Sequence, residues 1–178
     1  GFKFSYQETP KQNNNPKMSA ATDIGRIKVY HTTVVDKKGN LQANYTPSGR
    51  LRKLNLKSEK LLNNKRQNWL KITQYRLLNS DNSSLILNDK EAKLLEHNKH
   101  LAGKAHNLLI VISNLAGSEL ANKLAKHNIK THYTEQLNWI SGTTKSVVKK
   151  NRGSKWGHSQ TSKAIEHSLL RTGIPTIK

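Results

Sequence analysis

The chain has 178 residues, of which 31 are Lys or Arg and 11 are Asp or Glu, so its formal net charge is +20 at pH 7. This length suits one ordinary domain, and so large a positive charge favours a polyanionic partner, either nucleic acid or an acidic membrane. The sequence has no apolar run long enough to span a bilayer and no basic amphipathic stretch with a broad aromatic face, which favours nucleic acid. It also has no cysteine, which excludes disulfides and thiolate metal sites.

Residues 1–22 are predicted to form an extended N-terminal arm, because they are polar, include two prolines and three consecutive asparagines, and show no apolar period. The next stretch, Ile24–Val35, is rich in β-branched residues, which predicts a strand. Asp36–Asn40 has the composition of a hairpin turn that returns through Leu41–Tyr45. The Pro and Gly of Thr46–Gly49 then interrupt the chain again.

The segment from Arg50 to Leu78 is strongly basic, and its Leu and Trp residues recur loosely at the spacing of one helical face. Two interpretations are equally supported. The segment is either a solvated helical insertion or a helix whose cationic face lies along phosphates. In both cases we expect it to belong to an insertion at about 46–87.

A second helix is predicted for Asn88–Leu101, where Asn88 is an N-cap and two acidic residues in the first turn suit the helix dipole. Leu108–Ile112 is a continuous apolar run that is typical of a strand covered on both faces. Ser118–His127 has helical spacing, and Ile129–Thr134 is predicted as another strand. Strand, helix and strand in this order make a βαβ unit, so the predicted fold class is α/β.

The last part of the chain combines a basic loop with a short helix. Lys149–His158 holds four cations, two glycines and a tryptophan, which can follow a phosphate backbone and stack a ring on an unpaired base; a solvated loop is the alternative. Thr161–Thr172 is predicted as a helix with Gly173 as its C-cap, and Ile174–Ile177 as the start of a strand. A strand at this point implies that the natural domain continues or that another chain completes the sheet.

Four patches of sequence form a recognisable set when they are read in order. They are the opening residues Gly1, Phe4, Gln7, Asn15–Met18 and Gly25-x-Ile27, then Leu108–Ser113, then Leu137–Thr144, and finally Ala164–Pro175. Together they resemble the S-two family of small-subunit ribosomal proteins, and their joint order is more specific than any single patch. The likeness covers roughly half of the chain; Val34–Leu87 looks like an insertion, and Ser141 stands where the family has a glycine.

This resemblance implies a flavodoxin-like parallel sheet flanked by helices, in a single α/β domain at residues 23–178 with an incomplete C-terminal end. It implies a non-catalytic structural protein that binds ribosomal RNA and neighbouring small-subunit proteins, without a cofactor, metal, membrane or small-molecule substrate. The Lys- and Asn-rich insertions are typical of an organellar member, so the expected location is the mitochondrial matrix. The expected RNA-binding residues are Lys17, Arg26, Arg50, Arg52, Lys53, Lys145, Lys149, Lys150, Arg152, Lys155 and Trp156.

The alternative hypothesis is a basic, metal-independent ribonuclease domain of the toxin type. Such an enzyme needs an acid–base pair, for which His31, His132 and His158 are the candidates, although no sequence pattern brings them together. His97 and His100 share a helical spacing that a metal site could use, but no carboxylate or thiol completes the set at a recognisable distance. We therefore expect no metal site.

Overall fold

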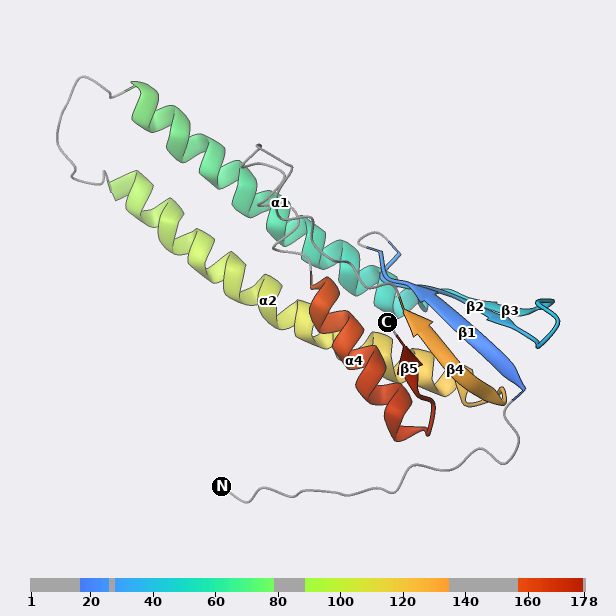
Figure 1. Cartoon of the computed structure of the whole chain (residues 1–178). Helices are drawn as coiled ribbons and strands as arrows, with labels where there is room; N and C mark the ends of the chain where they lie inside the picture. The colour runs from blue at the N-terminus through green and yellow to red at the C-terminus, as the bar shows by residue number, and fades with distance from the viewer. Residues whose placement is uncertain (1–16, 26–27, 79–88, 135–156, 178) are drawn as a thin grey trace, which may run out of the picture. The chain divides into compact units, whose positions relative to one another are not determined.

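The computed structural model describes residues 17–25, 28–78, 89–134 and 157–177 (Figure 1). Its elements are β1 (Met18–Asp23), β2 (His31–Val35), β3 (Leu41–Tyr45), α1 (Gly49–Leu78), α2 (Asp89–Leu124), β4 (Ile129–Thr134), α4 (His158–Arg171) and β5 (Thr176–Ile177). The chain divides into two compact units. The first unit comprises residues 1–52 and 112–178, and the second comprises 53–111.

The first unit is built on a five-stranded sheet in the order β3-β2-β1-β4-β5. β1 pairs in parallel with β4, and β4 pairs in parallel with β5, whereas β2 is antiparallel to both β1 and β3. The predicted α/β class is confirmed, but the expected flavodoxin-like parallel sheet is wrong. Short connections join β1 to β2 and β2 to β3, and a short connection can only join antiparallel strands.

The hairpin between β2 and β3 is confirmed. Oδ1 of Asp36 accepts hydrogen bonds from the backbone N–H groups of Lys38 at 2.8 Å and Asn40 at 2.9 Å. Gly39 has φ +84°, a left-handed conformation in which a Cβ atom would be strained. The turn chemistry that is visible in the sequence is therefore the chemistry that closes the hairpin.

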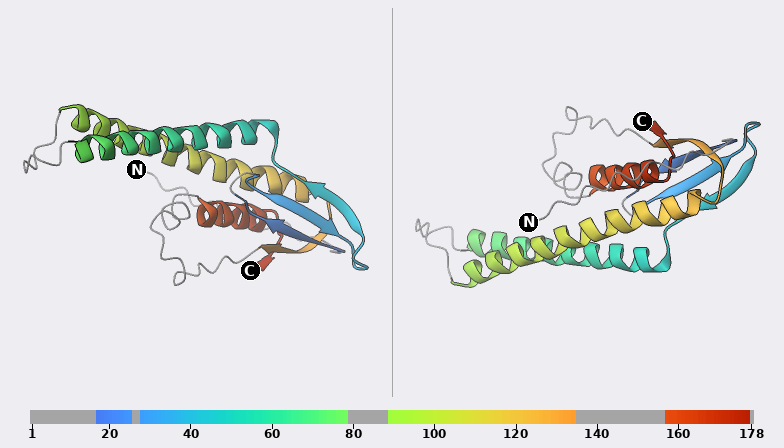
Figure 2. Two further views of the ribbon diagram at one scale, coloured as in Figure 1. Left: turned by 90° about the horizontal axis from the view of Figure 1, so that it is seen from above. Right: turned by 90° about the horizontal axis from the view of Figure 1, so that it is seen from below.

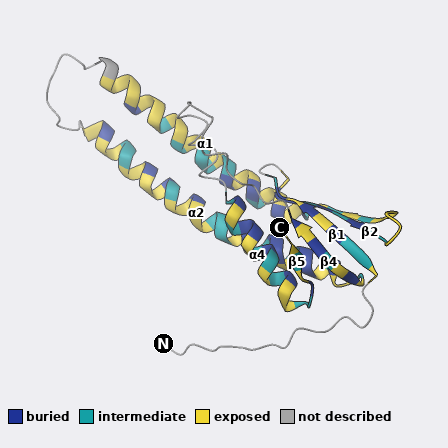
Figure 3. Cartoon of the chain, viewed as in Figure 1, coloured by how far each residue is buried: buried dark blue, intermediate teal, exposed yellow. Residues whose placement is uncertain are grey.

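One face of the sheet is buried and the other is open, because successive side chains of a strand point to opposite faces. On β1, Ala20 and Thr22 are buried while Ala21 and Asp23 are exposed, and β2 and β4 show similar alternation (Figure 3). Both parallel crossovers, β1 to β4 and β4 to β5, step in the same direction across the sheet. Since such crossovers are right-handed, α2 and α4 cover the same face.

The part of α2 in the first unit packs closely against α4 at Gly117. A Cβ atom at this position would lie 2.5 Å from the backbone oxygen of Ala164, which is closer than such atoms can approach. One turn earlier, the hydroxyls of Ser113 and Thr161 share a hydrogen bond of 3.0 Å. These small side chains let the two helices approach, so that the buried leucine and isoleucine side chains of both helices form the core: Ile112, Leu120, Leu124, Ile165 and Leu169.

The strand predicted for Leu108–Ile112 is wrong, because these residues lie within the continuous helix α2. Val111 is 49% exposed, so the run is not covered on all sides as a buried strand would be. Ser113 and Gly117, which follow this run in the same helix, both serve the contact with α4. The parallel partner of β4 is β1, more than a hundred residues earlier in the chain.

The N-terminal arm predicted for residues 1–22 is corrected for its last residues, because Met18–Asp23 form β1, the central strand. The small residues of β1 do not form the apolar pattern by which a buried strand is predicted, yet they fit a strand that is paired on both sides. The strand predicted for Ile24–Val35 is formed only from His31 onward. The link between β1 and β2 contains Val29 with φ +60°, a rare conformation for a β-branched residue. Residues 1–16 lie outside the described ranges.

Two further predictions are confirmed in the described ranges. The helix predicted for Thr161–Thr172 is α4; its C-cap is Thr172, and Gly173, predicted as the C-cap, follows at the next position with φ +78°. The basic segment from Arg50 to Leu78 is helical throughout, as α1. No helix in the described part of the chain is both long and apolar enough to cross a membrane.

The second unit is a pair of helical segments, the parts of α1 and α2 between residues 53 and 111, which run side by side in the views of Figures 1 and 2. Nδ2 of Asn68 donates a hydrogen bond of 3.0 Å to Oδ1 of Asn98, and Arg76 lies 3.5 Å from Glu91. The buried apolar side chains in the described part of these two segments are Ile72, Leu101 and Ala105.

Candidate functional site

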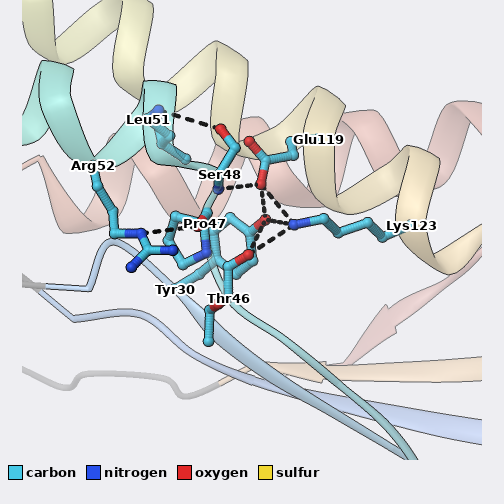
Figure 4. Close-up of polar contacts among 8 residues, drawn as sticks. All are labelled: Tyr30, Thr46, Pro47, Ser48, Leu51, Arg52, Glu119 and Lys123. Carbon is cyan, nitrogen blue, oxygen red and sulfur yellow. Dashed lines mark hydrogen bonds and ion pairs between the residues drawn. The ribbon is translucent and has the colours of Figure 1, made fainter.

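A hydrogen-bonded cluster around Glu119 fixes the start of α1 in the first unit (Figure 4). Oε1 of Glu119 accepts hydrogen bonds from the Tyr30 hydroxyl at 2.6 Å, the Ser48 backbone N–H at 2.7 Å and the Lys123 ammonium at 2.7 Å. Lys123 also donates to the Thr46 carbonyl at 2.7 Å. One carboxylate thereby joins three segments: the residue before β2 (Tyr30), the link between β3 and α1 (Ser48) and helix α2.

The Glu119 carboxyl group is ionised at neutral pH. Burial raises the pKa of Glu119, but hydrogen bonds from Lys123, Tyr30 and Ser48 outweigh it and hold the pKa below its usual range. Burial, the hydrogen bond to Glu119 and the charge of that carboxylate all raise the pKa of Tyr30 well above its usual value. Every member is engaged in internal contacts, so we assign the cluster a structural role in holding the first turn of α1.

The cationic side chains of α1 follow directly from this anchored turn. Arg50, Arg52 and Lys53, three of the residues expected to bind RNA, are exposed on it. The Nε atom of Arg52 donates to the Pro47 carbonyl at 3.2 Å, which orients the guanidinium. Along its length α1 carries nine Lys or Arg residues against a single acid, Glu59, a difference of +8. A helix of this charge is suited to a polyanion.

Most of the other expected RNA-binding residues cannot be placed. Lys17 is exposed immediately before β1. Seven residues lie outside the described ranges: Arg26, Lys145, Lys149, Lys150, Arg152, Lys155 and Trp156. The structure therefore places Arg50, Arg52 and Lys53 as exposed residues near the start of α1, and residues 149–156 of the predicted loop lie outside the described ranges.

The open face of the sheet has a hollow of about 420 Å³ where β1 and β4 end. Asp23, the last residue of β1, lines this hollow directly opposite His31 on β2, together with Thr33 and Tyr133. Asp23 is exposed, and Nδ1 of His31 is buried without a hydrogen-bond partner in the described chain. In open α/β sheets, ligands bind outside the carboxyl ends of the parallel strands, which is where this hollow lies.

The covered face holds a chain of polar side chains that crosses four strands. The hydroxyls of Thr32 and Thr22 share a hydrogen bond of 2.7 Å, and Thr22 lies 2.7 Å from Nε2 of His132. Nδ1 of His132 lies 3.3 Å from the hydroxyl of Thr176 on β5. His132 is fully buried, and this burial lowers its pKa to about 4. It is therefore neutral at physiological pH.

The acid–base pair of the ribonuclease hypothesis is not formed. His132 lies on the covered face and His31 on the open face, because their positions in the strands have opposite orientation. His158 begins α4, on a third element. Within the described ranges, no cluster of three or more His, Cys, Asp or Glu side chains is placed to hold a metal ion.

Comparison with known proteins relates the chain to solved structures only. No family model matches it, and no curated protein matches it in sequence. The fold resembles a chain in the cryo-EM structure of the Cas12f1–sgRNA–target DNA complex, with a TM-score of 0.58, 16% identity, and coverage of 92% of this chain and 29% of that chain. A CRISPR–Cas12f ternary complex gives a TM-score of 0.56 with 18% identity, covering 96% of this chain and 30% of that one.

These likenesses overturn the ribosomal interpretation, which rested on four short patches. The chain has the fold of a portion of the Cas12f proteins and spans less than a third of their length. One of the patches, Leu108–Ser113, contains the predicted strand, and the structure shows that it is helical. The S-two identity, the structural role in the ribosome and the ribosomal partners are therefore wrong. The mitochondrial location was inferred from the same resemblance and stays untested.

Sequence reasoning missed Asp23, the hollow around it and the Glu119 cluster. Asp23 was assigned to no site, because a single acid in a strongly basic chain is not conspicuous. Its signal is positional, since it comes directly after a run of four small residues, Ser19–Thr22, and is followed by Ile24 and Gly25. Glu119 joins segments that are up to 89 residues apart, a distance over which no local pattern operates.

Proposed function

We propose that this chain is a nucleic-acid-binding portion of an RNA-guided effector of the Cas12f kind. The observation that carries this proposal is the extent of the likeness: 92% of the chain aligns with a chain of the Cas12f1–sgRNA–target DNA complex, and 96% aligns with a chain of a CRISPR–Cas12f ternary complex. In such effectors the protein contacts the sugar–phosphate backbone and the shape of the nucleic acid, while base pairing between guide RNA and target DNA reads the sequence. A net charge of +20 suits this kind of contact.

Helix α1 is the surface that we expect to contact phosphates. It carries nine Lys or Arg residues and one acid, and most of the cations, from Lys53 onward, belong to the second unit. Each phosphate contact releases counterions, which makes the affinity fall linearly with the logarithm of the salt concentration.

The test measures binding of an RNA hairpin and of an RNA–DNA heteroduplex to the whole chain as the salt concentration is raised. Replacing Lys53, Lys57 and Lys60 by Gln should reduce the salt slope by roughly two to three units. The matched control removes the same charge outside α1, at Lys37, Lys38 and Lys126, and should change the slope much less. Equal slopes for both triple variants would refute the assignment to α1, and the absence of binding by the parent would refute the proposed function.

A second candidate function, phosphodiester cleavage assisted by a divalent cation, is favoured by the position of Asp23. Mg²⁺ is commonly bound through one or two carboxylates together with substrate phosphates, and the described residues of the hollow supply one carboxylate. Asp23 would hold the cation, which would stabilise charge on the phosphate. Tyr133 and Thr33 would line the approach.

This second candidate can be tested by metal binding rather than by turnover. Mn²⁺ added to the whole chain should broaden the amide signals of Ala21, Asp23 and His31 in NMR spectra, and Asp23→Asn should abolish the effect. The exposed hairpin carboxylate Asp36 is an internal control, because it is occupied by turn hydrogen bonds. Broadening at Asp36 equal to that at Asp23 would show adventitious binding and refute the site.

A further inference from the structure

A groove lies between the two helical segments of the second unit, and it combines an exposed aromatic ring with a buried hydrogen-bond donor that has no acceptor in the described chain. Its volume is about 510 Å³, within the range of roughly 300–1,000 Å³ that is usual for small-molecule sites. It is lined from both helices, by an aromatic ring, a buried amide, an apolar side chain and three charged groups: Trp69, Asn98, Leu95, Lys65, Glu96 and Lys99.

Trp69 is the aromatic ring of this groove and remains 44% exposed. A large indole that is left half in water on a cationic helix is available for stacking, and every nucleic-acid base has a face that can stack on it. A base inside a duplex is covered on both faces by its neighbours. The ring is therefore suited to an unpaired base.

Asn98 is the second, independent feature. It is 3% exposed, and its Oδ1 accepts a hydrogen bond of 3.0 Å from Asn68. Its Nδ2 is buried without an acceptor in the described chain. Buried polar groups are normally satisfied, so an unused donor in the lining of a groove indicates an acceptor that comes from a ligand. A carbonyl oxygen or ring nitrogen on the edge of a base supplies such an acceptor.

The charges at the groove fit a ligand that also carries phosphate. Lys65 and Lys99 line it from α1 and α2, and the Lys99 ammonium lies 3.5 Å from the Glu96 carboxylate. Residues 53–111 contain eleven Lys or Arg and five Asp or Glu, a difference of +6, so the surroundings are cationic. The Glu96 carboxylate is an acceptor that can receive a hydrogen bond from a base amino group.

We propose that this groove binds one unstacked base of a single-stranded nucleic acid, with the base on Trp69, its edge on the Asn98 amide and the adjacent phosphates on Lys65 and Lys99. The inference rests on the proposed function and deepens it. It assigns to the second unit a contact that reads the presence of an unpaired base, in addition to the phosphate contacts along α1.

The experiment uses the whole chain with Trp139→Phe and Trp156→Phe, which leaves Trp69 as its only tryptophan. A short oligouridylate should quench the Trp69 fluorescence, whereas inorganic polyphosphate, which offers charge without bases, should not. In the otherwise unchanged chain, Trp69→Ala should weaken oligouridylate binding roughly 5- to 150-fold and leave the salt slope unaltered. Leu70→Ala, an exposed neighbour outside the groove, is the matched control and should have no effect.

The outcomes separate this inference from the proposed function. If the parent binds oligouridylate but Trp69→Ala binds equally well and no quenching occurs, the groove is not a base site while the proposed function stands. Equal quenching by polyphosphate would also overturn the inference, because the signal would then report charge alone. If the parent binds no nucleic acid at all, both proposals fail. The quenching measurement needs no change at Trp69, so it holds even where the Ala variant folds poorly.

Discussion

His132 makes the stability of the first unit depend on pH. The imidazole is fully buried between threonine hydroxyls, and its pKa falls from 6.5 to about 4 because burial penalises the charged form. The hydroxyls of Thr22 and Thr176 can accept from a charged ring, so the loss of water, rather than the loss of partners, opposes protonation. Between pH 6.5 and about 4, His132 is therefore protonated in the unfolded chain but neutral in the folded chain.

The free energy of unfolding should therefore fall as the pH drops from about 6.5 to about 4 and level off below that window. A fall of the His132 pKa from 6.5 to about 4 corresponds to about 3 kcal/mol of folding free energy, which is a large share of the stability of a domain of this size.

The assay is urea unfolding followed by circular dichroism across this pH window, for the parent and for His132→Gln. The glutamine keeps a hydrogen-bonding group near Thr22 but does not titrate, so its curve should lack about 3 kcal/mol of the acid-induced loss. His97→Gln, an exposed histidine on α2, is the control and should follow the parent. Parallel curves for the parent and His132→Gln would refute the reasoning.

Three further substitutions test the packing, each by urea unfolding. Gly117→Ala should lower the free energy of unfolding by about 1–3 kcal/mol, because the added methyl meets the Ala164 carbonyl. Gly103→Ala, in an open part of the same helix, should instead raise it by about 0.5–1 kcal/mol, and effects of the same sign would contradict this account. Glu119→Ala should cost about 1–3 kcal/mol, since it removes the acceptor of the Ser48 N–H and the nearer acceptor of the Tyr30 hydroxyl; an unchanged midpoint would show that water replaces the carboxylate.

The elements that local chemistry determines could be predicted from the sequence. The Asp36–Asn40 turn, the Gly173 cap and the helical periodicity of α1 each depend on residues a few positions apart. The strand predicted for Leu108–Ile112 is wrong because local residues do not determine the structure of this run. A short apolar run does not distinguish a strand from part of a helix, and these residues lie within the 36-residue helix α2.

The candidate site was largely beyond prediction, because it depends on pairings across long stretches of chain. The pairing of β1 with β4 sets the position of Asp23. On Asn98, the facing helix supplies a hydrogen bond to Oδ1 from Asn68 and leaves the buried Nδ2 group without an acceptor in the described chain. The basic character of α1 was readable, and with it the preference for a polyanion. The identity of that partner was not, since Lys and Arg neutralise the phosphates of ribosomal RNA and of any other nucleic acid alike.

The central place of β1 sets the order in which the sheet can assemble. β1, β2 and β3 are joined by short turns, so they can pair as soon as they leave the ribosome. The other side of β1 must wait for β4, since Thr22 and His132 are 110 residues apart in the chain. Closing so long a loop costs entropy before any contact repays it, and long-range pairing slows folding. Until then β1 presents an unpaired edge, where a nascent chain is open to misassociation and to capture by chaperones.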